Sequence, residues 1–564
     1  MLPVSSYALE ITMPAISINN VSFSYSTIPV LDRISLYVGD GERACLVGPN
    51  GCGKTTLLRI ASGDLSPDQG TVTVSAVTPK LFQLPNVERL SGSVDDYLTA
   101  ALHPLRSIAT QFDNVTTRIS GDTSALSATS EDYDQLLAQM VYLDIWALDA
   151  RMAEVMAGLS LEAFIGSERG RDVSTLSPGQ RARLQLAMTL IMKPGVLILD
   201  EPTNHLDSDA ISFLTHTVKG WDGPVLMASH DRAFIEDTAT VVYDMDVQVW
   251  NELAKAGGNS EVAGLYRCAG TYSDYLAEKT GAWCKYAELH ATQQAEKRKL
   301  AQHRHAASTI ARGGVRVATA SGKAKKFFAD RAASTAQRRI RNDDKRLDIL
   351  TSHEVRKPRS YELSFRFAQP VRRSGIAVSV RQAGVKGRLA PVSFDLAHGE
   401  HLLVTGANGS GKTTLLNWIY TGAPPADGQA SGTMSRSKAV SIVPQHLPTA
   451  DDPGSATSGG SGSGVSADVW QNGIGQAGKG ILHPSMWATP IAQLSAGNQR
   501  RAQIALAIAS TPAILIIDEP TNYLDLDTMQ VLEEALDSWT GTLIIASHDH
   551  WLIEHWHGRK IHIS

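Results

Sequence analysis

Short apolar runs alternate with longer segments of mixed polarity along the chain. The runs Arg43–Val47 and His401–Thr405 predict buried β-strands, and a helical spacing of apolar residues follows each of them. Two further short runs, Val196–Leu199 and Ile514–Ile517, also predict strands. No apolar run approaches the roughly 20 residues that a membrane-spanning helix needs. The pattern indicates an α/β fold with parallel sheets.

A different pattern fills the middle of the chain. Residues 272–357 contain no proline, and their spacing predicts two long helices, about Ser273–Ala311 and about Phe328–Leu350, on either side of a loop that contains glycine. Roughly 39 helical residues at about 1.5 Å each would span roughly 55 Å. We therefore expect a long α-helical hairpin.

The chain contains the same domain twice. A glycine-rich motif ending in Gly-Lys-Thr-Thr, a Leu-Ser-x-Gly motif, an Asp-Glu-Pro-Thr-Asn-x-Leu-Asp motif and an Ala-Ser-His-Asp motif occur in this order in both halves. They begin at Gly48, Leu176, Asp200 and Ala228 in one copy, and at Gly406, Leu494, Asp518 and Ala546 in the other. The repeat predicts a first domain over residues 1–250, a linker over 251–358 and a second domain over 359–564.

The first copy is longer between its glycine-rich and Leu-Ser motifs. Sequence rich in Ala, Leu and Asp fills this interval from about residue 93 to about residue 156 and predicts helices. These helices form either an arm-like hairpin that projects from the domain or a slightly larger helical subdomain.

Composition adds a contrast in charge. The 564 residues carry a net charge of -5 and match an ordinary globular protein, yet Lys297–Arg346 holds fifteen Lys or Arg and three Asp or Glu. The four cysteines lack paired or metal-ligand spacing, which favours a reducing cytoplasm and implies no zinc site. The basic segment suits a polyphosphate partner, although a solvated linker would show the same charges.

Each glycine-rich motif lies between a predicted strand and a predicted helix, which is the context of a phosphate-binding loop. Glycine lets backbone N–H groups close around phosphates at a helix N-terminus, the Lys neutralises the outer phosphates, and the Thr hydroxyl can bind Mg²⁺. We therefore expect two ATP sites. The predicted ATP-binding residues are Gly48, Asn50, Gly51, Gly53, Lys54, Thr55, Thr56 and Gln83 in the first copy, and Gly406, Asn408, Gly409, Gly411, Lys412, Thr413, Thr414 and Gln445 in the second.

Two adjacent carboxylates end a predicted strand in each copy, and ligands bind at this carboxyl edge of parallel sheets. The aspartate suits Mg²⁺, and the glutamate can accept a proton from the attacking water while a histidine orients that water against the γ-phosphate. The predicted catalytic residues are Glu201, His230, Glu519 and His548. The predicted Mg²⁺ ligands are Thr55, Gln83 and Asp200 in the first copy and Thr413, Gln445 and Asp518 in the second.

Together these motifs resemble the ABC ATPase superfamily over both halves of the chain. Leu-Ser-x-Gly is the motif specific to that superfamily, and we call it the signature. The resemblance implies that the signature of each domain completes the ATP site of the other. The first loop would pair with Ser495 and Gly497, and the second loop with Ser177 and Gly179. Two ATP molecules would then join the two halves of a monomer.

The two copies differ in the aromatic residues available to bind adenine. Tyr25 can stack on the base in the first copy. The corresponding stretch of the second copy, Ala377–Leu389, contains no aromatic residue. We therefore expect base recognition in the second site to be weaker or to come from elsewhere.

The tandem arrangement resembles the ABC-F proteins in particular. Both copies carry Asp-Glu-Pro-Thr-Asn-x-Leu-Asp, and Gly-Thr-Tyr-Ser-Asp-Tyr-Leu from Gly270 opens the linker. The resemblance implies a cytoplasmic ATPase that uses ATP and Mg²⁺ and binds the ribosome, with the linker tip directed towards transfer RNA and ribosomal RNA. It implies no DNA partner and no stable membrane insertion. The insert of the first copy would correspond to the arm of this family.

Within ABC-F, the basic stretches Gly322–Phe328 and Arg338–Asn342 make the linker similar to macrolide and lincosamide resistance proteins. This implies protection of the ribosome from antibiotics. A housekeeping translation factor and the ATPase half of a drug exporter are the alternatives. The residues expected to contact RNA at the linker tip are Arg312, Arg316, Lys323, Lys325, Lys326, Phe327 and Phe328.

Overall fold

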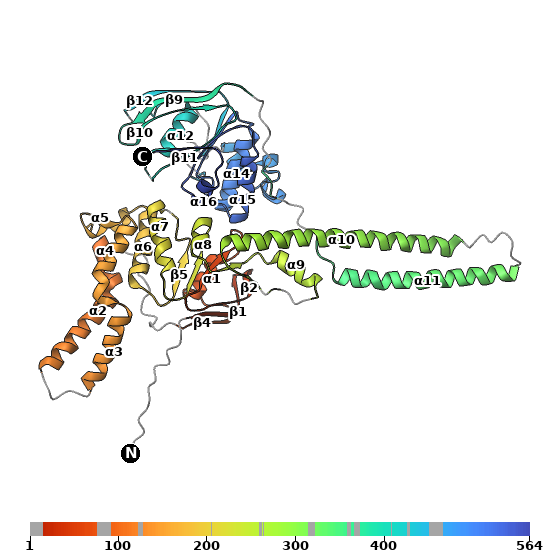
Figure 1. The fold of residues 1–564 in the computed structure, drawn as a ribbon, viewed down its shortest axis with the longest axis horizontal. Coiled ribbons are helices and arrows are strands. Elements are labelled where there is room, and N and C mark those ends of the chain that lie inside the picture. Colours follow the sequence, from red (N-terminus) through yellow and green to blue (C-terminus); the bar gives the residue numbers. More distant parts are fainter. Residues whose placement is uncertain are drawn as a thin grey trace, which may run out of the picture.

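The computed structural model describes residues 15–75, 92–121, 128–204, 206–258, 262, 264–313, 322–357, 363–365, 373–407, 409–425, 429–449 and 466–563. Two α/β domains lie side by side, and helical hairpins project from the body that they form (Figure 1). The described elements have the predicted arrangement of two tandem α/β domains joined by a long helical hairpin.

Domain 1, the first repeat, contains two sheets. In its described residues the larger sheet has the order β5-β6-β3-β7-β8, and the smaller, antiparallel sheet has the order β2-β1-β4. Strand β8 pairs antiparallel with β7, so this sheet extends past residue 250. The strands are β1 (Ala15–Tyr25), β2 (Ile28–Val38), β3 (Arg43–Val47), β4 (Gln69–Ser75), β5 (Leu197–Asp200), β6 (Val225–Ala228), β7 (Val241–Asp244) and β8 (Tyr266–Ala269).

Domain 2, the second repeat, has the same construction. Its described residues form a parallel sheet of order β13-β14-β15-β11-β16 and an antiparallel sheet of order β10-β9-β12. The strands are β9 (Ile376–Val385), β10 (Leu389–Ala397), β11 (His401–Thr405), β12 (Ala430–Arg436), β13 (Val440–Val443), β14 (Ile514–Asp518), β15 (Thr542–Ala546) and β16 (Arg559–His562). Strands β3 and β11 have the predicted bounds, because each is an apolar run that is buried in its sheet.

Helices pack on the sheets of both domains. In domain 1 they are α1 (Lys54–Ala61), α4 (Leu148–Gly158), α5 (Glu162–Ile165), α6 (Pro178–Met192), α7 (Ser208–Lys219), α8 (Arg232–Thr238) and α9 (Gln248–Ala256). In domain 2 they are α12 (Lys412–Thr421), α13 (Ala467–Asn472), α14 (Ala496–Ala509), α15 (Leu526–Asp537) and α16 (His550–Glu554). Helices α6 and α14 begin immediately after the serine of the Leu-Ser-x-Gly motif, which caps each helix.

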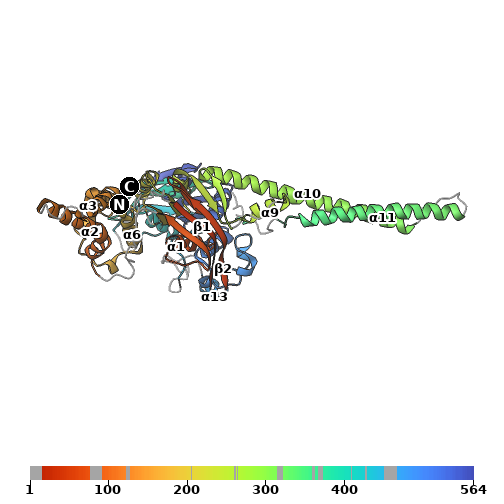
Figure 2. The ribbon, with the colours of Figure 1, turned by 90° about the horizontal axis from the view of Figure 1, so that it is seen from below.

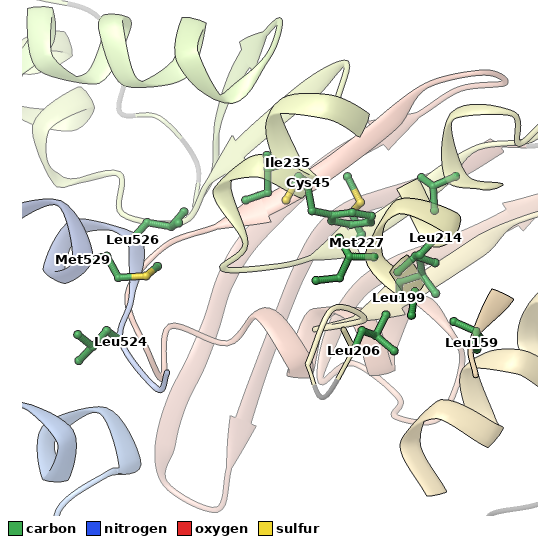
Figure 3. Packing of buried hydrophobic residues seen from close by; sticks show 14 of the residues in the cluster. Cys45, Leu159, Leu199, Leu206, Leu214, Met227, Ile235, Leu524, Leu526 and Met529 are labelled. Atoms are coloured by element: carbon green, nitrogen blue, oxygen red, sulfur yellow. The ribbon is translucent and has the colours of Figure 1, made fainter. Parts of the chain in front are cut away.

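One buried apolar cluster includes residues of both domains. Figure 3 shows Met227 and Leu199 of domain 1 among its members, together with Leu524, Leu526 and Met529 of domain 2. These three domain 2 residues come from α15 and the loop before it, and the cluster continues into β11, β13, β14, β15 and α14. The two repeats therefore meet through apolar packing. This packing includes Leu199, next to the Asp200–Glu201 pair, and Leu524, within the Asp-Glu-Pro-Thr-Asn-x-Leu-Asp motif of domain 2.

Two hairpins project from opposite ends of the molecule; the linker hairpin runs along its long axis, and the arm-like insert points obliquely away from that axis (Figures 1 and 2). The arm-like insert contains α2 (Val94–Gly121) and α3 (Ala128–Tyr142). The linker contains α10 (Tyr272–Gly313) and α11 (Gly322–Ser352), which lie side by side. The 42 residues of α10 span roughly 60 Å at about 1.5 Å each. No helix among the described residues is both long and apolar enough to cross a membrane.

Candidate ATP-binding sites

The glycine-rich loop of domain 1 joins β3 to α1 in a conformation that requires glycine. Gly48, Gly51 and Gly53 have φ angles of 144°, 84° and 103°. A Cβ atom on Gly53 would lie 2.7 Å from the Leu31 side chain, whereas a Cβ on Gly51 would meet no atom within 4 Å. The loop is therefore packed against the domain on one side and open on the other, where phosphates can approach the backbone N–H groups.

The loop of domain 2 repeats this geometry between β11 and α12. Gly406, Gly409 and Gly411 have φ angles of 151°, 86° and 97°. A Cβ on Gly411 would lie 2.3 Å from the carbonyl oxygen of Arg388, and a Cβ on Gly409 would meet nothing within 4 Å. Asn408, a predicted ATP-binding residue of this loop, lies outside the described residues.

Both loop lysines turn back onto their own loops. Lys54 Nζ donates to the carbonyl oxygen of Gly48 at 2.8 Å, and Lys412 Nζ donates to that of Gly406 at 2.6 Å. Each lysine is 8% exposed. An ammonium group in this position lies beside the loop that can receive phosphates, so it can exchange a carbonyl partner for a phosphate oxygen.

The paired carboxylates stand where β5 and β14 end. Glu201 and Glu519 have positive φ angles of 46° and 51°, which non-glycine residues rarely adopt. The backbone N–H of Glu201 donates to the carbonyl oxygen of Ala228, and that of Glu519 to Ala546, each at 2.8 Å. Neighbouring strands thus hold both glutamates in a strained conformation of the kind that is concentrated at active sites.

Each glutamate lies beside the histidine of the Ala-Ser-His-Asp motif. His230 Nε2 lies 3.4 Å from Glu201 Oε1, and His548 Nδ1 lies 2.8 Å from Glu519 Oε1. In domain 1, burial raises the pKa of Glu201 to about 7 and lowers the pKa of His230 to about 4. In domain 2, burial acts to lower the pKa of His548, but the hydrogen bond and charge of Glu519 outweigh it and raise this pKa. The closer pair therefore favours a charged histidine.

Two of the three predicted Mg²⁺ ligands of domain 2 lie together. Thr413 Oγ1 donates to Asp518 Oδ2 at 2.6 Å, while Asp518 Oδ1 is buried without a hydrogen-bond partner among the described residues. Burial raises the pKa of Asp518 to about 6. A hydroxyl–carboxylate pair in which the aspartate is buried and has a spare carboxylate oxygen fits a hard cation such as Mg²⁺.

The structure describes the remaining predicted Mg²⁺ ligands less fully or does not place them together. In domain 1, burial raises the pKa of Asp200, and a hydrogen bond with Thr55 opposes this shift. Gln83 lies outside the described residues, and Gln445 is exposed after β13. Among the other predicted ATP-binding residues, Thr56 is buried and Thr414 is half-buried at the starts of their helices.

The loop of domain 1 touches the signature of domain 2. Asn50 Nδ2 donates to the carbonyl oxygen of Tyr523 at 3.0 Å. A Cβ on Gly497 would lie 2.7 Å from Asn50 Nδ2, so the glycine is needed for this close approach. Ser495 is exposed and caps α14. We call the loop, carboxylates and histidine of domain 1 together with Ser495 and Gly497 site 1.

We call the loop, carboxylates and histidine of domain 2, together with the signature of domain 1 that is predicted to complete them, site 2. Ser177 is exposed at the start of α6 and forms a reciprocal capping box with Gln180. Gly179 is half-buried in the first turn. On the adenine side of site 1, Tyr25 is 47% exposed at the end of β1 and packs edge-on against Phe23, which leaves a ring face available for stacking.

Two cations join the domains near these sites and were not found from the sequence. Arg232, two residues after His230, donates through Nη1 to Glu533 Oε2 at 2.7 Å. Lys279, in the second turn of α10, lies 3.0 Å from Asp527 in domain 2 and 3.6 Å from Asp244 in domain 1. Their partners in domain 2 lie more than 200 residues away in the chain, so no local pattern signals these contacts.

The linker tip is described only in part. Arg312 ends α10, and Lys323, Lys325, Lys326, Phe327 and Phe328 begin α11. The side chains of these six residues lie outside the described part of the structure, as does all of Arg316. Their proposed contacts with RNA therefore stay predictions.

Each repeat carries a phosphate-binding loop, a carboxylate pair at a strand end and a helix capped by the serine of Leu-Ser-x-Gly, and the loop of domain 1 lies against Gly497 of domain 2. This is the arrangement of a tandem ABC-type ATPase. The ABC transporter family model matches residues 31–204 and 389–522. The ATP-binding protein Uup of Escherichia coli is 29% identical to this chain, and the match covers 96% of the chain and 79% of Uup. The tylosin resistance ATP-binding protein TlrC of Streptomyces fradiae is 30% identical to this chain, and the match covers 95% of the chain and 94% of TlrC.

A solved structure shows the same kind of fold. The archaeal ribosome recycling factor aABCE1, in complex with the archaeal ribosomal stalk protein aP1, gives a TM-score of 0.51 at 15% identity, over 96% of this chain and 87% of that one. The chain belongs to the ABC-F family of ATP-binding proteins. It is an ATPase.

Proposed function

We propose that this ATPase binds the ribosome in its ATP-bound form and acts there through the basic linker. The observation that carries the proposal is the hairpin α10–α11, which extends from the ATPase body (Figure 1). Arg298, Lys299, Arg338, Arg339 and Arg341 are exposed along it. A long basic element of this kind suits an RNA backbone, which presents regularly spaced phosphates.

Hydrolysis at each site uses the strand-end residues. Mg²⁺, held by Thr55 and Asp200 in site 1, and by Thr413 and Asp518 in site 2, would neutralise charge on the phosphates. The glutamate accepts a proton from water as the water oxygen attacks the γ-phosphorus and the bond to ADP breaks. The nearby histidine orients the water, and the loop lysine stabilises the phosphate charge.

ATP also supplies a switch. Because the loop of domain 1 meets the signature of domain 2 directly, ATP bound between them would favour the closed arrangement. Hydrolysis removes the bridging γ-phosphate and would let the domains separate. Ribosome binding should then depend on the nucleotide, and the protein should work in the cytoplasm.

Co-sedimentation with ribosomes tests this function. The Glu201→Gln and Glu519→Gln double variant, which should hold ATP without turnover, is expected to pellet with ribosomes in ATP and to remain in the supernatant with ADP. Binding should weaken as salt rises from 50 to 200 mM, by roughly 10³-fold if about six phosphates are contacted. Equal pelleting with ATP, with ADP and without nucleotide would remove the basis for the switch.

Antibiotic resistance is the finer part of the proposal, and similarity to a tylosin resistance protein supports it. We propose that the linker tip protects ribosomes from macrolide- or lincosamide-type drugs by moving RNA or transfer RNA near the drug. A housekeeping translation role and an exporter ATPase are the alternatives. Binding to ribosomes speaks against the exporter, whereas copurification with a membrane protein would favour it.

Drug susceptibility separates resistance from housekeeping. A sensitive host that expresses the intact chain should tolerate more drug than a host that expresses a chain shortened over residues 313–321. A chain shortened over residues 122–127, in the arm-like insert, is the matched control. Equal protection by the intact and tip-shortened chains would show that the tip is not the effector.

A further inference from the structure

Arg500 lies wholly buried in α14 and binds the backbone beside the carboxylates of site 2. Its Nη2 donates to the carbonyl oxygens of Asp518 and Glu519, at 2.7 Å each. Its Nη1 donates to the carbonyl oxygen of Pro444, which immediately precedes Gln445. One planar guanidinium thus ties together three carbonyl groups from two separate segments of site 2.

Gln503, almost one turn further along α14, strengthens this connection. Its Oε1 accepts from Arg500 Nη1 at 3.3 Å, and its Nε2 donates to the carbonyl oxygen of His446 at 3.1 Å. Gln503 is 3% exposed. The segment from Pro444 to His446, which carries Gln445, is therefore fastened to the signature helix at two points.

The described residues of domain 1 show no such connection. The position of Arg500 in the repeat is Ala182, and the position of Gln503 is Gln185; both are exposed on α6. The two sites also differ in solvent access, since the side chain of Glu201 is 24% exposed and that of Glu519 is 4% exposed. The arginine therefore accompanies the more enclosed of the two carboxylate pairs.

The energetics explain why an arginine is suited to this place. Glu519 has a strained positive φ, and a bond to its carbonyl oxygen helps to hold that conformation. A buried carbonyl group without a donor is costly, as is a buried cation without partners. Arg500 supplies donors to three such carbonyls. Burial lowers its pKa to about 10, and the charges of Asp518 and Glu519 oppose this shift.

We propose that Arg500 is a positioning residue for ATP hydrolysis at site 2. It fixes the backbone of Gln445 relative to the backbone of Asp518 and Glu519. The side chains that would bind Mg²⁺ and activate water then keep constant distances from one another. In the part of site 1 that the structure describes, Ala182 stands in place of this arginine. The proposal rests on the assignment of Glu519 to hydrolysis at site 2.

Helix α14 makes the proposal testable, because it serves both sites. Its first turn carries Gly497, which meets Asn50 of site 1. General damage to α14 would therefore impair both sites. Loss of positioning would impair site 2 alone.

The experiment measures single-turnover ATP hydrolysis at each site separately. Glu201→Gln leaves hydrolysis to site 2, and Glu519→Gln leaves it to site 1. In the first background, Arg500→Met should lower the maximal rate about 10-fold, a loss typical of slightly misplaced catalytic groups. The ATP concentration for half-maximal rate should change less than about twofold, because the loop and its lysine are untouched.

In the second background, Arg500→Met should leave the rate at site 1 within about twofold. Ala182→Met, the matched change in domain 1, should affect neither site. Arg500→Lys keeps the charge but loses the planar fork, so it should reduce hydrolysis at site 2 by a smaller factor. This variant also serves if Arg500→Met does not fold, as judged by its melting temperature.

Equal losses at both sites, or no loss at site 2 for both arginine variants, would overturn the proposal. A failure of the underlying assignment is recognised separately. In that case Glu519→Gln added to Glu201→Gln would leave hydrolysis at site 2 intact, before any change is made to Arg500.

Discussion

Glu201 and Glu519 occupy the same position in the two repeats, but their surroundings differ. Burial raises the pKa of Glu201 to about 7, and its histidine lies 3.4 Å away. Glu519 is 3% exposed and lies 2.8 Å from His548. Chemically equivalent residues are thus held at different distances from their partners, which favours unequal turnover at the two sites.

Replacing both glutamates tests their role directly. Glu201→Gln together with Glu519→Gln should lower ATP turnover at least about 100-fold, because a general base contributes 10²- to 10⁴-fold. ATP binding should persist, since the loops and lysines are unchanged. Steady-state phosphate release and equilibrium binding of labelled ATP measure the two effects. Turnover near the wild-type rate would mean that other groups activate the water.

The loop glycines make a prediction about stability. Gly411→Ala should destabilise domain 2 by about 2 kcal/mol or more, because the added Cβ would lie 2.3 Å from a backbone carbonyl oxygen at a positive φ. Gly409→Ala is the matched control, since its φ is also positive but its Cβ would meet open space. Urea unfolding compares them, and equal losses would contradict the packing described for this loop.

At the scale of elements, the sequence predicted those parts that leave a local pattern. Strand β3 and strand β11 are continuous apolar runs, and both long linker helices lie in a stretch without proline. The motif residues at each strand end followed from the repeat. The buried contacts of Arg500 and Lys279 did not, because each depends on partners that only the folded chain brings near. The strained φ of Glu201 likewise has no sequence signal.

The start of α10, where the linker leaves domain 1, allows a further prediction. Lys279 of α10 is buried between Asp244 and Asp527, and Tyr275 donates its hydroxyl proton to Asp244 at 2.9 Å. Asp527→Asn should raise the ATP concentration needed for domain closure about threefold, a modest effect because Asp527 is 52% exposed. Asp209→Asn, the same first-turn change in α7, is the matched control.

Closure can be followed by energy transfer between labels at Asp222 and Ser538, which are exposed on the two domains. The double glutamate variant with Cys284 replaced by Ser provides the background, since Cys284 is exposed. If Asp527→Asn and Asp209→Asn shift the ATP dependence equally, the contact of Lys279 with domain 2 does not stabilise the closed arrangement.

At the scale of the whole molecule, the two repeats are neither independent nor equivalent. Apolar packing, the bond from Asn50 to Tyr523 and the ion pair of Arg232 with Glu533 all join domain 1 to domain 2. The hairpins project from opposite ends of this joined body (Figure 2). A change in the distance between the domains would therefore alter the surface that the whole molecule presents.

The central claim is that each ATP site is shared between the repeats, and one measurement tests it most directly. In the Glu519→Gln background, only site 1 hydrolyses ATP. The loop and carboxylates of site 1 belong to domain 1, whereas the substitution Gly497→Asp lies in domain 2. The added side chain would clash with Asn50 and place a negative charge near the γ-phosphate. We predict that single-turnover hydrolysis falls about 100-fold while domain 1 still binds ATP. Hydrolysis at the unsubstituted rate would contradict the shared site.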